Sequence, residues 1–313
     1  MLLAVRRARR VAAAALVTVA AASALACQIV LQIDGKDLVD AGDDGSRASD
    51  AGVADGAASQ DGPSGAGDAG DGAPVRTSCP TSVQGATLVG IPSPFGGVMC
   101  IDATEVTHVQ YEAFLAALRG GAQPKQPPEC SWNATFAPNP ACDDAGTGCS
   151  GTDCNSFPRN CVDWCDAWAY CAWAGKALCG AFDGGPSPYG VKDDPRSSQW
   201  TNACTSGGKH AFPYGDAYVA GLCRTFTSSP VGGGTLPDCQ SKETGYKNVY
   251  DLSGNVSEWE NSCISSTGQS DSCTIRGGDY GFEDDDVRCA TARFDSHSRD
   301  TARQEVGFRC CAP

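Results

Sequence analysis

The stretch from Asn248 to Trp259 reads Asn-Val-Tyr-Asp-Leu-Ser-Gly-Asn-Val-Ser-Glu-Trp, and the rest of the chain can be ordered around it. Its central Ser253-Gly254-Asn255 is typical of a tight turn. Two further segments follow: Arg276-Gly277-Gly278-Asp279-Tyr280 and, near the end, Gly307-Phe308-Arg309-Cys310. Short segments of this kind, separated by loops rich in turn-forming residues, predict a domain with little regular secondary structure.

Three earlier segments belong to the same ordered series. They are Ile101-Asp102-Ala103-Thr104-Glu105-Val106-Thr107, Ala167-Trp168-Ala169-Tyr170-Cys171-Ala172-Trp173-Ala174-Gly175-Lys176, and Phe212-Pro213-Tyr214-Gly215-Asp216. In this order the six segments resemble the formylglycine-generating enzyme family, also called sulfatase-modifying factors. The resemblance covers most of residues 79–313. It implies an α+β fold that is low in regular structure, disulfide-rich and related to C-type-lectin-like folds.

Residues 1–26 have the three-part layout of an export signal, with four arginines, an apolar run from Val11 to Ala22, and small residues before Cys27. The run is too short and too rich in small residues to indicate a spanning helix. The box Ala24-Leu25-Ala26-Cys27 fits either ordinary cleavage, which would release a secreted protein, or lipidation of Cys27. We expect a lipoprotein of the bacterial cell envelope. Gln28, rather than Asp, beside the cysteine indicates the outer membrane by analogy with other bacterial lipoproteins.

Residues 27–75 are predicted to form a disordered tether. From residue 34 to 75 the chain holds ten aspartates, with only Lys36 and Arg47 as positive charges and no aromatic residue. Such a segment has too little apolar surface to offset its ordering entropy. The whole chain has a net charge of -14, which argues against nucleic acid as a partner and against electrostatic adhesion to anionic lipid. We therefore expect contact with the membrane only through the lipid anchor.

Residues 76–313 are predicted to form a single α+β domain. Apolar runs at 87–89 and 98–101, separated by glycines and prolines, predict two strands joined by a loop. Residues 121–160 are rich in Pro, Gly, Asn and Cys and predict a cross-linked loop. Ser198-Gln199-Trp200 stands where the family has a Glu-x-Glu-Trp element, so the salt bridges of those glutamates are not expected here.

Two helices can be predicted from their first residues. Thr107, with Gln110 three positions later, has the pattern of a capping box, and helical spacing of apolar residues continues until Gly120. Asp163 is expected to cap a second helix, with Asp166 in its first turn. Both helices should bury one face in the core.

The 19 cysteines indicate disulfides rather than zinc. Setting aside Cys27 leaves an even number, which suits full pairing in an oxidising compartment. Cys223 with Cys239, and Cys263 with Cys273, are expected to close local loops, and Cys289 is expected to pair with Cys310 or Cys311. The cysteines that we single out as disulfide candidates are Cys79, Cys100, Cys223, Cys239, Cys263, Cys273, Cys289 and Cys310.

The resemblance does not extend to the catalytic cysteines. Catalytic family members bind copper(I) with two cysteines shortly after the Arg-Gly-Gly element, but the interval from Asp279 to Arg288 contains none. Aspartates 284–286 are the wrong ligands for this soft ion, so we expect no copper. They fit a solvated loop or a hard-cation site. The three scattered histidines, at 108, 210 and 297, cannot assemble the iron site of a second catalytic branch.

Resemblance also implies a structural calcium ion at the central stretch. It places the ligands on the side chains of Asp251 and Glu258 and on the backbone carbonyls of Gly254 and Val256. A turn between two carboxylates can supply hard oxygen ligands of the kind that calcium prefers. The alternative is a turn that packs Trp259 into the core, with both acids merely hydrogen-bonded.

Two classes of function remain open. The first is a non-catalytic, exported module that binds a protein or glycan of the cell envelope, stabilised by calcium and disulfides. The second is a cysteine-dependent oxidoreductase that modifies an envelope protein, with the vicinal pair Cys310-Cys311 as its candidate thiols. We favour the first, because a catalytic thiol needs an accessible, electropositive setting.

Overall fold

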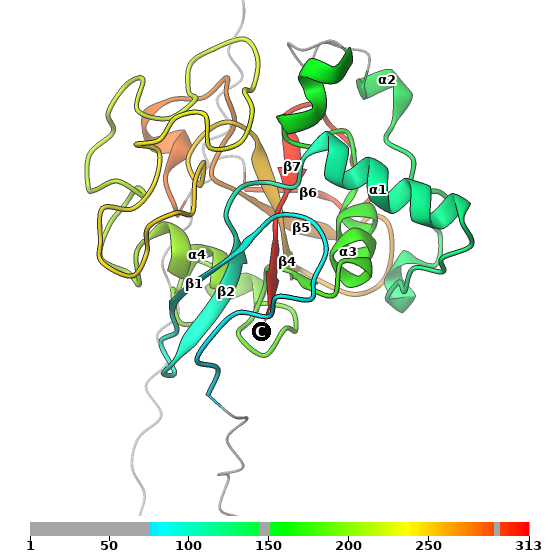
Figure 1. Cartoon of the computed structure of the whole chain (residues 1–313), viewed down its shortest axis with the longest axis horizontal. Coiled ribbons are helices and arrows are strands. Elements are labelled where there is room, and N and C mark those ends of the chain that lie inside the picture. The colour runs from blue at the N-terminus through cyan, green and yellow to red at the C-terminus, as the bar shows by residue number, and fades with distance from the viewer. Residues whose placement is uncertain (1–74, 144–150, 291–294, 313) are drawn as a thin grey trace, which may run out of the picture. The chain divides into compact units, whose positions relative to one another are not determined.

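The computed structural model describes residues 75–143, 151–290 and 295–312. Between them it contains the helices and strands shown in Figure 1. The helices are α1 (His108–Arg119), α2 (Pro140–Asp143), α3 (Trp164–Trp173) and α4 (Gln199–Cys204), and the strands are β1 (Leu88–Pro92), β2 (Val98–Asp102), β3 (Ala177–Leu178), β4 (Ser257–Cys263), β5 (Ser272–Arg276), β6 (Ser296–Ser298), β7 (Val306–Phe308) and β8 (Cys310–Ala312).

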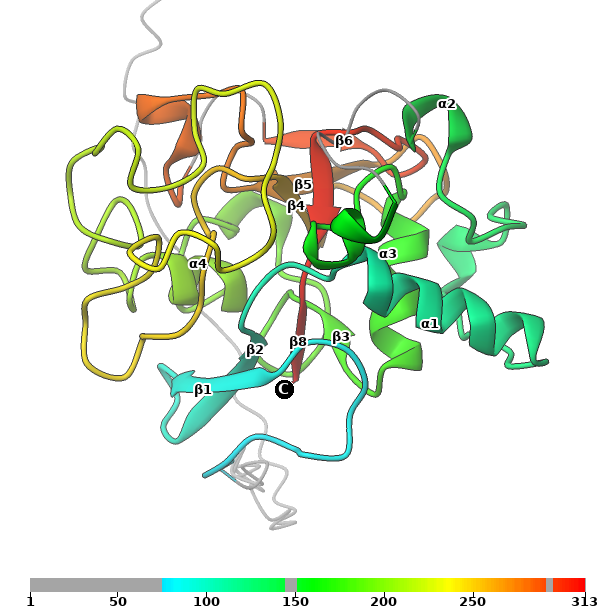
Figure 2. The same cartoon turned by 45° about the horizontal axis from the view of Figure 1, so that its top comes forward.

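The strands form two four-stranded sheets that share the end of the chain. One has the order β1-β2-β8-β3 and the other β6-β5-β4-β7. Strand β7 runs parallel to β4, with Ser257 opposite Val306, and β8 runs antiparallel to β2, with Cys100 opposite Ala312. Arg309 is the single residue between β7 and β8. It therefore lies where the chain passes from one sheet into the other. Figure 2 shows this passage in the red, C-terminal part of the ribbon.

Both predicted helix starts are confirmed. At the start of α1 the N–H of Thr107 donates to Oε1 of Gln110 at 2.9 Å, and Gly120 ends the helix. Asp163 caps α3 by accepting a hydrogen bond from the backbone of Asp166. The two helices bury aromatic rings against each other and against β7; the centroid of Tyr170 lies 5.6 Å from Tyr111, 5.7 Å from Phe114 and 5.4 Å from Phe308.

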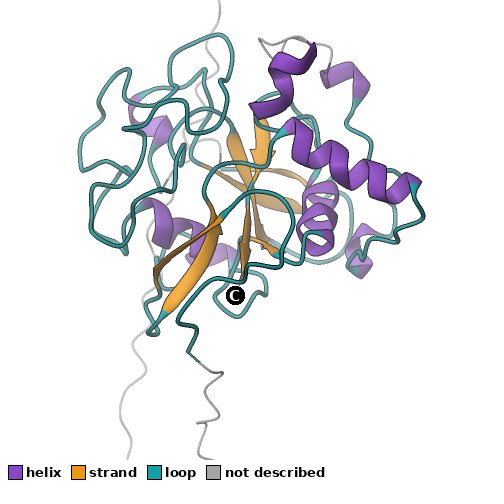
Figure 3. Ribbon diagram, in the orientation of Figure 1, coloured by secondary structure: helices purple, strands orange, loops and turns teal. Residues whose placement is uncertain are grey.

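The two strands expected near the N-terminal end of the domain are also confirmed, as β1 and β2. Beyond α4 the described chain runs from Thr205 to Val256 with isolated bridges as its only strand pairing. Figure 3 shows this part as loops on the side of the sheets away from α1 and α3. The α+β class with low regular structure is therefore confirmed. Turns with glycines in the left-handed region, such as Gly234 and Gly254, replace helices in this part of the chain.

Every cysteine in the described ranges is disulfide-bonded. The expectation that Cys289 pairs with Cys310 or Cys311 is wrong, because Cys289 bonds to Cys204 and both C-terminal cysteines bond elsewhere. Cys204 ends α4. The N–H of Cys289 donates to the carbonyl of Ala211, which follows α4 in the chain, so Cys289 lies beside Cys204 although the two are 85 residues apart. Cys154 is bonded as well, and the other described cysteines form the pairs Cys79–Cys100, Cys130–Cys165, Cys142–Cys161, Cys171–Cys310, Cys179–Cys311, Cys204–Cys289, Cys223–Cys239 and Cys263–Cys273.

The expected signal at 1–26 and almost all of the expected tether at 27–75 lie outside the described residues. Among the helices that are described, none has the length and apolar character needed to cross a membrane.

Candidate functional site

The central turn is built on positive backbone φ angles. Asp251, Gly254 and Asn255 have φ of 61°, 73° and 60°. Glycine is required at 254, since a Cβ there would approach the carbonyl oxygen of Arg224 to 2.4 Å. The turn is held from both sides: the N–H of Gly254 donates to Gly277 and that of Asn255 to Arg224. All residues from 251 to 256 are buried, so the turn lies inside the domain.

Glu258 forms a buried ion pair with Arg309. The guanidinium Nε lies 2.7 Å from Oε2 of Glu258 and Nη2 lies 2.6 Å from Oε1. Trp200 donates a further hydrogen bond to Oε2 at 2.9 Å. Arg309 also donates to the carbonyls of Asp102 and Tyr250. The bidentate pair therefore joins β4 to the β7–β8 junction, and it occupies both oxygens of Glu258.

Glu105 and Asp251 are two further buried carboxylates with one unpaired oxygen each. Glu105 accepts from Asn255 Nδ2 at 2.8 Å through Oε1, and Asp251 accepts from Gly234 N at 2.6 Å through Oδ2. Oε2 of Glu105 and Oδ1 of Asp251 are buried without a hydrogen-bond partner. Burial raises the pKa of Asp251 to about 6. Burial, and then repulsion by Asp251, raises the pKa of Glu105 well above its usual range.

The charges of this group do not balance. Three carboxylates, those of Glu105, Asp251 and Glu258, act electrostatically on one guanidinium, that of Arg309. Fully ionised, the group carries two uncompensated negative charges, and isolated buried charge is costly. We call Glu105, Asp251, Glu258 and Arg309 the central carboxylate cluster.

The predicted calcium ligands fit this arrangement in part. Asp251 fits, since its free Oδ1 is buried beside the turn. Gly254 and Val256 also fit, because their carbonyls accept no hydrogen bond from any described residue. Glu258 does not offer a free oxygen, and Glu105 does. In the described ranges no three His, Cys, Asp or Glu side chains converge as a metal cluster, so a cation here would rest on two carboxylates and on backbone oxygens.

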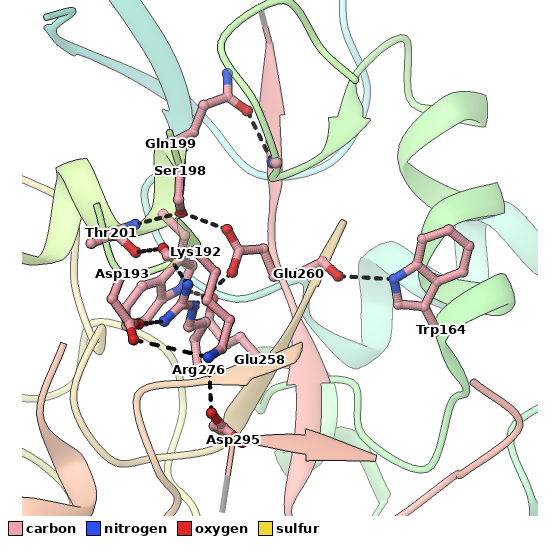
Figure 4. Close-up of polar contacts among 12 residues, drawn as sticks. Trp164, Lys192, Asp193, Ser198, Gln199, Thr201, Glu258, Glu260, Arg276 and Asp295 are labelled. Carbon is pink, nitrogen blue, oxygen red and sulfur yellow. Dashed lines mark hydrogen bonds and ion pairs between the residues drawn. The ribbon is translucent and has the colours of Figure 1, made fainter. Parts of the chain in front are cut away.

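A second buried network lies beside the cluster on β4 and β5 (Figure 4). Arg276 donates from Nε to Glu260 at 2.6 Å and from its other nitrogens to Asp193 and the Lys192 carbonyl. Ser198 caps α4 and donates its hydroxyl to Glu260. Ser198 thus supplies a neutral donor to this network, and the carboxylate comes from Glu260 on β4.

The interval without cysteines packs directly against the central turn. Tyr280 donates its N–H to the carbonyl of Asn255, and Ser253 donates its hydroxyl to the carbonyl of Val287. Burial raises the pKa of Asp279 to about 6. The nearest cysteine in sequence, Cys289, is in a disulfide. The described interval from Asp279 to Arg288, and the cysteine that follows it, therefore offer no free thiol that could bind copper.

The aspartates at 284–286 and the histidines remain apart from the cluster. Asp284 and Asp285 are exposed, and Asp285 pairs with Arg288 at 2.8 Å. His210 contacts Asp216 and Glu243 on the surface, whereas His297 packs edge-on against Trp259. No ligand set unites the histidines within the described residues.

Sequence reasoning missed Glu105 and Arg309 as members of the site. Both lie in quoted segments: Glu105 stands between Thr104 and the buried Val106 after β2, and Arg309 between the buried residues Phe308 and Cys310. A single charged residue inside a buried apolar run indicates a buried partner. For Arg309 this pattern could have indicated a buried charged side chain. It could not have identified the partners of that side chain, which lie far away in the chain.

Comparisons with known proteins agree with these observations. The family model for the sulfatase-modifying factor enzyme 1-like domain matches residues 97–312. Proteins named inactive C-alpha-formylglycine-generating enzyme 2 are similar over 186 residues, at 27% identity in Bos taurus and 26% in Mus musculus. That alignment covers 54% of this chain and 54% of the Bos taurus protein, so the chain spans about half the length of these relatives.

Solved structures with a similar fold include CarF and PvdO of Pseudomonas aeruginosa. CarF is 21% identical with a TM-score of 0.44, over 74% of this chain and 96% of CarF. PvdO is 18% identical with a TM-score of 0.45, over 73% of this chain and 92% of PvdO.

Proposed function

Because the chain belongs to the sulfatase-modifying factor enzyme 1-like family, we propose that it is a non-catalytic member that binds a protein or glycan in the bacterial cell envelope. The observation that carries the proposal is the state of the cysteines. The interval from Asp279 to Arg288 has none, and those in the described ranges are all bonded. The similar mammalian proteins are themselves named inactive, which supports the proposal.

The test is an assay for formylglycine formation. A peptide carrying a sulfatase-type cysteine, incubated with the protein, copper(I) and oxygen, should keep its mass. An active family member, run beside it, is the positive control. Loss of the thiol with gain of an aldehyde would show that the domain is catalytic by another arrangement.

The alternative, an oxidoreductase with Cys310 and Cys311 as its thiols, has less support. Cys310 is bonded to Cys171 and Cys311 to Cys179, and all four sulfurs are buried. A redox thiol needs access to its substrate. Titration of free thiols on the native, unreduced protein should give none. Two reactive thiols per chain would favour the oxidoreductase instead.

The proposed setting is a lipid anchor at Cys27, followed by the acidic tether. Its support is the export signal and the tether composition. Mass spectrometry of the mature protein should find an acylated cysteine at the N-terminus, and an unmodified N-terminal residue would contradict the anchor. Cross-linking in intact cell envelopes, followed by identification of the captured species, is the experiment that can name the protein or glycan partner.

Calcium is proposed as a structural ion of the central carboxylate cluster. One divalent cation would neutralise the two uncompensated charges, and oxygen ligands suit calcium. We assign the side-chain ligands to Asp251 and Glu105, whose free oxygens are buried, together with the carbonyls of Gly254 and Val256. Glu258 would stay in its ion pair with Arg309. It would not bind the calcium ion, but its negative charge would attract the ion to the cluster.

Thermal unfolding with calcium and with chelator tests this assignment. A ligand that binds only the folded state adds about 2.7 kcal/mol at 100 times its dissociation constant, so calcium should raise Tm. Asp251→Ala and Glu105→Gln should abolish the rise, whereas Asp285→Asn, at an exposed acid, should leave it intact. Coincident curves from protein shown to be metal-free would refute the site.

A further inference from the structure

A separate cavity lies between the start of α3 and the loop that follows β4. Its volume is about 220 Å³, and its wall includes Glu129, Trp164, Asn261, Ser265 and Arg299. Disulfides frame it on two sides, because Cys130–Cys165 ties the segment of Glu129 to α3 and Cys263–Cys273 closes the loop of Ser265. None of these residues belongs to the central carboxylate cluster.

Arg299 lies in the wall with most of its hydrogen-bonding capacity unused. Its side chain is 1% exposed, and its guanidinium stacks 4.6 Å from the ring of Trp164. Nη2 donates to the carbonyl of Ser265 at 3.1 Å. Nε and Nη1 are buried without a hydrogen-bond partner. Leaving buried donors unpaired is unfavourable, and more so when they are charged, so we expect a ligand that brings an acceptor to this guanidinium.

The neighbouring carboxylates do not supply that acceptor. Asp271 lies 3.5 Å from Nη2, and its oxygens already accept hydrogen bonds from Ser265, Thr267 and Gly268. Glu129 lies 3.8 Å from Nη1 and its side chain is 20% exposed. The cavity thus presents a buried cation and, nearer to solvent, an anion that is just beyond hydrogen-bonding distance.

We propose that this cavity binds a small zwitterion of the α-amino acid class, with its carboxylate on Arg299 and its ammonium on Glu129. A simple anion would be repelled by the carboxylates of Glu129 and Asp271, and a simple cation would be repelled by the guanidinium of Arg299. A zwitterion satisfies both wall charges and brings no net charge into the cavity. Stacking of a sugar on Trp164 is disfavoured, because that ring is 2% exposed and bears the guanidinium.

The inference rests on the proposed function, because it names the class of ligand that the proposed binding module would take. It can nevertheless fail alone. Failure of the amino-acid site would leave the formylglycine assay unchanged, and a catalytic result in that assay would leave binding at this cavity unchanged.

Isothermal titration calorimetry of the intact protein tests the proposal, with glycine as the zwitterion, acetate as the anion and methylamine as the cation. Glycine should bind saturably, and the two half-molecules at least tenfold more weakly. Glu129→Gln, which removes a charge at a partly exposed position without a side-chain hydrogen bond in the described structure, should weaken glycine at least tenfold. Tenfold corresponds to about 1.4 kcal/mol. Glu283→Gln, at an exposed acid, is the matched control.

Three outcomes would overturn the proposal. Absence of saturable glycine binding up to about 10 mM, a Kd limit that corresponds to less than about 3 kcal/mol, would mean that water alone occupies the cavity. Equal affinity for acetate and glycine would reduce the site to an adventitious anion site only. Unchanged glycine affinity in Glu129→Gln would show that Glu129 does not bind the ammonium group.

Arg299→Lys keeps the charge but not the planar donors. It should also weaken glycine binding while the protein still unfolds cooperatively.

Discussion

At the scale of single residues, burial decides how the charges behave. Asp102 and Lys176 form an ion pair in which both side chains are 0% exposed. Asp102 also accepts a hydrogen bond from the backbone N–H of Cys310. Even so, burial outweighs the attraction of Lys176 and raises the pKa of Asp102 to about 6. The pair therefore fixes the start of β3 against β2 more than it adds net stability, and the hydrogen bond from Cys310 holds β8 against β2.

Removal of one partner should nonetheless be costly. Asp102→Asn keeps an acceptor for Cys310 but leaves the Lys176 ammonium buried and unpaired, so we expect a loss of about 3–5 kcal/mol in the free energy of unfolding. Asp285→Asn, which breaks an exposed pair with Arg288, should change stability by less than about 1 kcal/mol. Urea unfolding at pH 7 measures both variants, and equal losses would contradict the distinction.

The pKa of Asp279 gives stability a dependence on pH. Burial raises it from 3.8 to about 6, so between about pH 4 and 6 the folded protein holds a proton that the unfolded chain has released. The contribution of this group to the free energy of unfolding therefore falls as the pH rises through that window. Burial also raises the pKa values of Asp102, Asp163 and Asp251, so these groups contribute in the same direction.

Asp279→Asn should flatten this dependence. Asparagine keeps an oxygen for the N–H of Gly281, which now donates to Asp279 Oδ1 at 2.7 Å, but it cannot ionise. Urea unfolding at pH 4, 5, 6 and 7 should show a smaller decline in the variant than in the parent protein. Parallel curves would mean that Asp279 does not titrate in this window.

At the scale of elements, helix α3 depends on its first turn. Asp163 Oδ1 accepts from the N–H of Asp166 at 2.9 Å, and Asp166 Oδ2 accepts from the N–H of Asp163 at 3.3 Å. Asn133 holds the other oxygen of Asp166 at 2.9 Å. The capping box thus connects the helix to the irregular segment before it.

Loss of this cap should destabilise the protein measurably. Asp163→Ala removes the acceptor for the first turn, and we expect the free energy of unfolding to fall by about 0.5–2 kcal/mol. Asp163→Asn retains a good capping oxygen and should lose much less. Guanidinium unfolding of the two variants distinguishes the cap from a general effect of substitution, which would destabilise both equally.

At the scale of the whole molecule, disulfides connect segments that are far apart in sequence. Cys171–Cys310 spans 139 residues and ties α3 to β8, whereas Cys223–Cys239 spans 16 and closes one loop. In the loop-entropy account a crosslink stabilises more when its loop is longer. The long bridges should therefore contribute most to holding the two sheets together.

Paired removal tests this order. Cys179–Cys311 closes nearly the same loop as Cys171–Cys310, so both bridges must be removed together to release it. Replacing these four cysteines by alanine should cost about 4 kcal/mol in the loop-entropy account, since Cys204–Cys289 still shortens the loop, and Cys223→Ala with Cys239→Ala should cost about 3 kcal/mol. Urea midpoints of the oxidised variants give the comparison. A larger loss from the short bridge would mean that local packing, rather than chain entropy, sets the contribution.

The sequence alone determined what depends on neighbours in the chain. The caps of α1 and α3, the strands β1 and β2, and the short crosslinks Cys223–Cys239 and Cys263–Cys273 follow from residue types a few positions apart, because turns, caps and small loops are local. The family also followed from the sequence, through the order of its segments, as did the absence of cysteine from Asp279 to Arg288.

Only the tertiary structure decided which distant groups meet. Glu105 contacts Asn255 across 150 residues, and Arg309 contacts Asp102 across 207. The partner of Cys289 depended on how α4 packs, and the free oxygen of Glu105 and the guanidinium of Arg299 depended on what surrounds them. The sequence shows which side chains can carry a charge. Its burial and its partners arise from packing between segments, which local sequence does not encode.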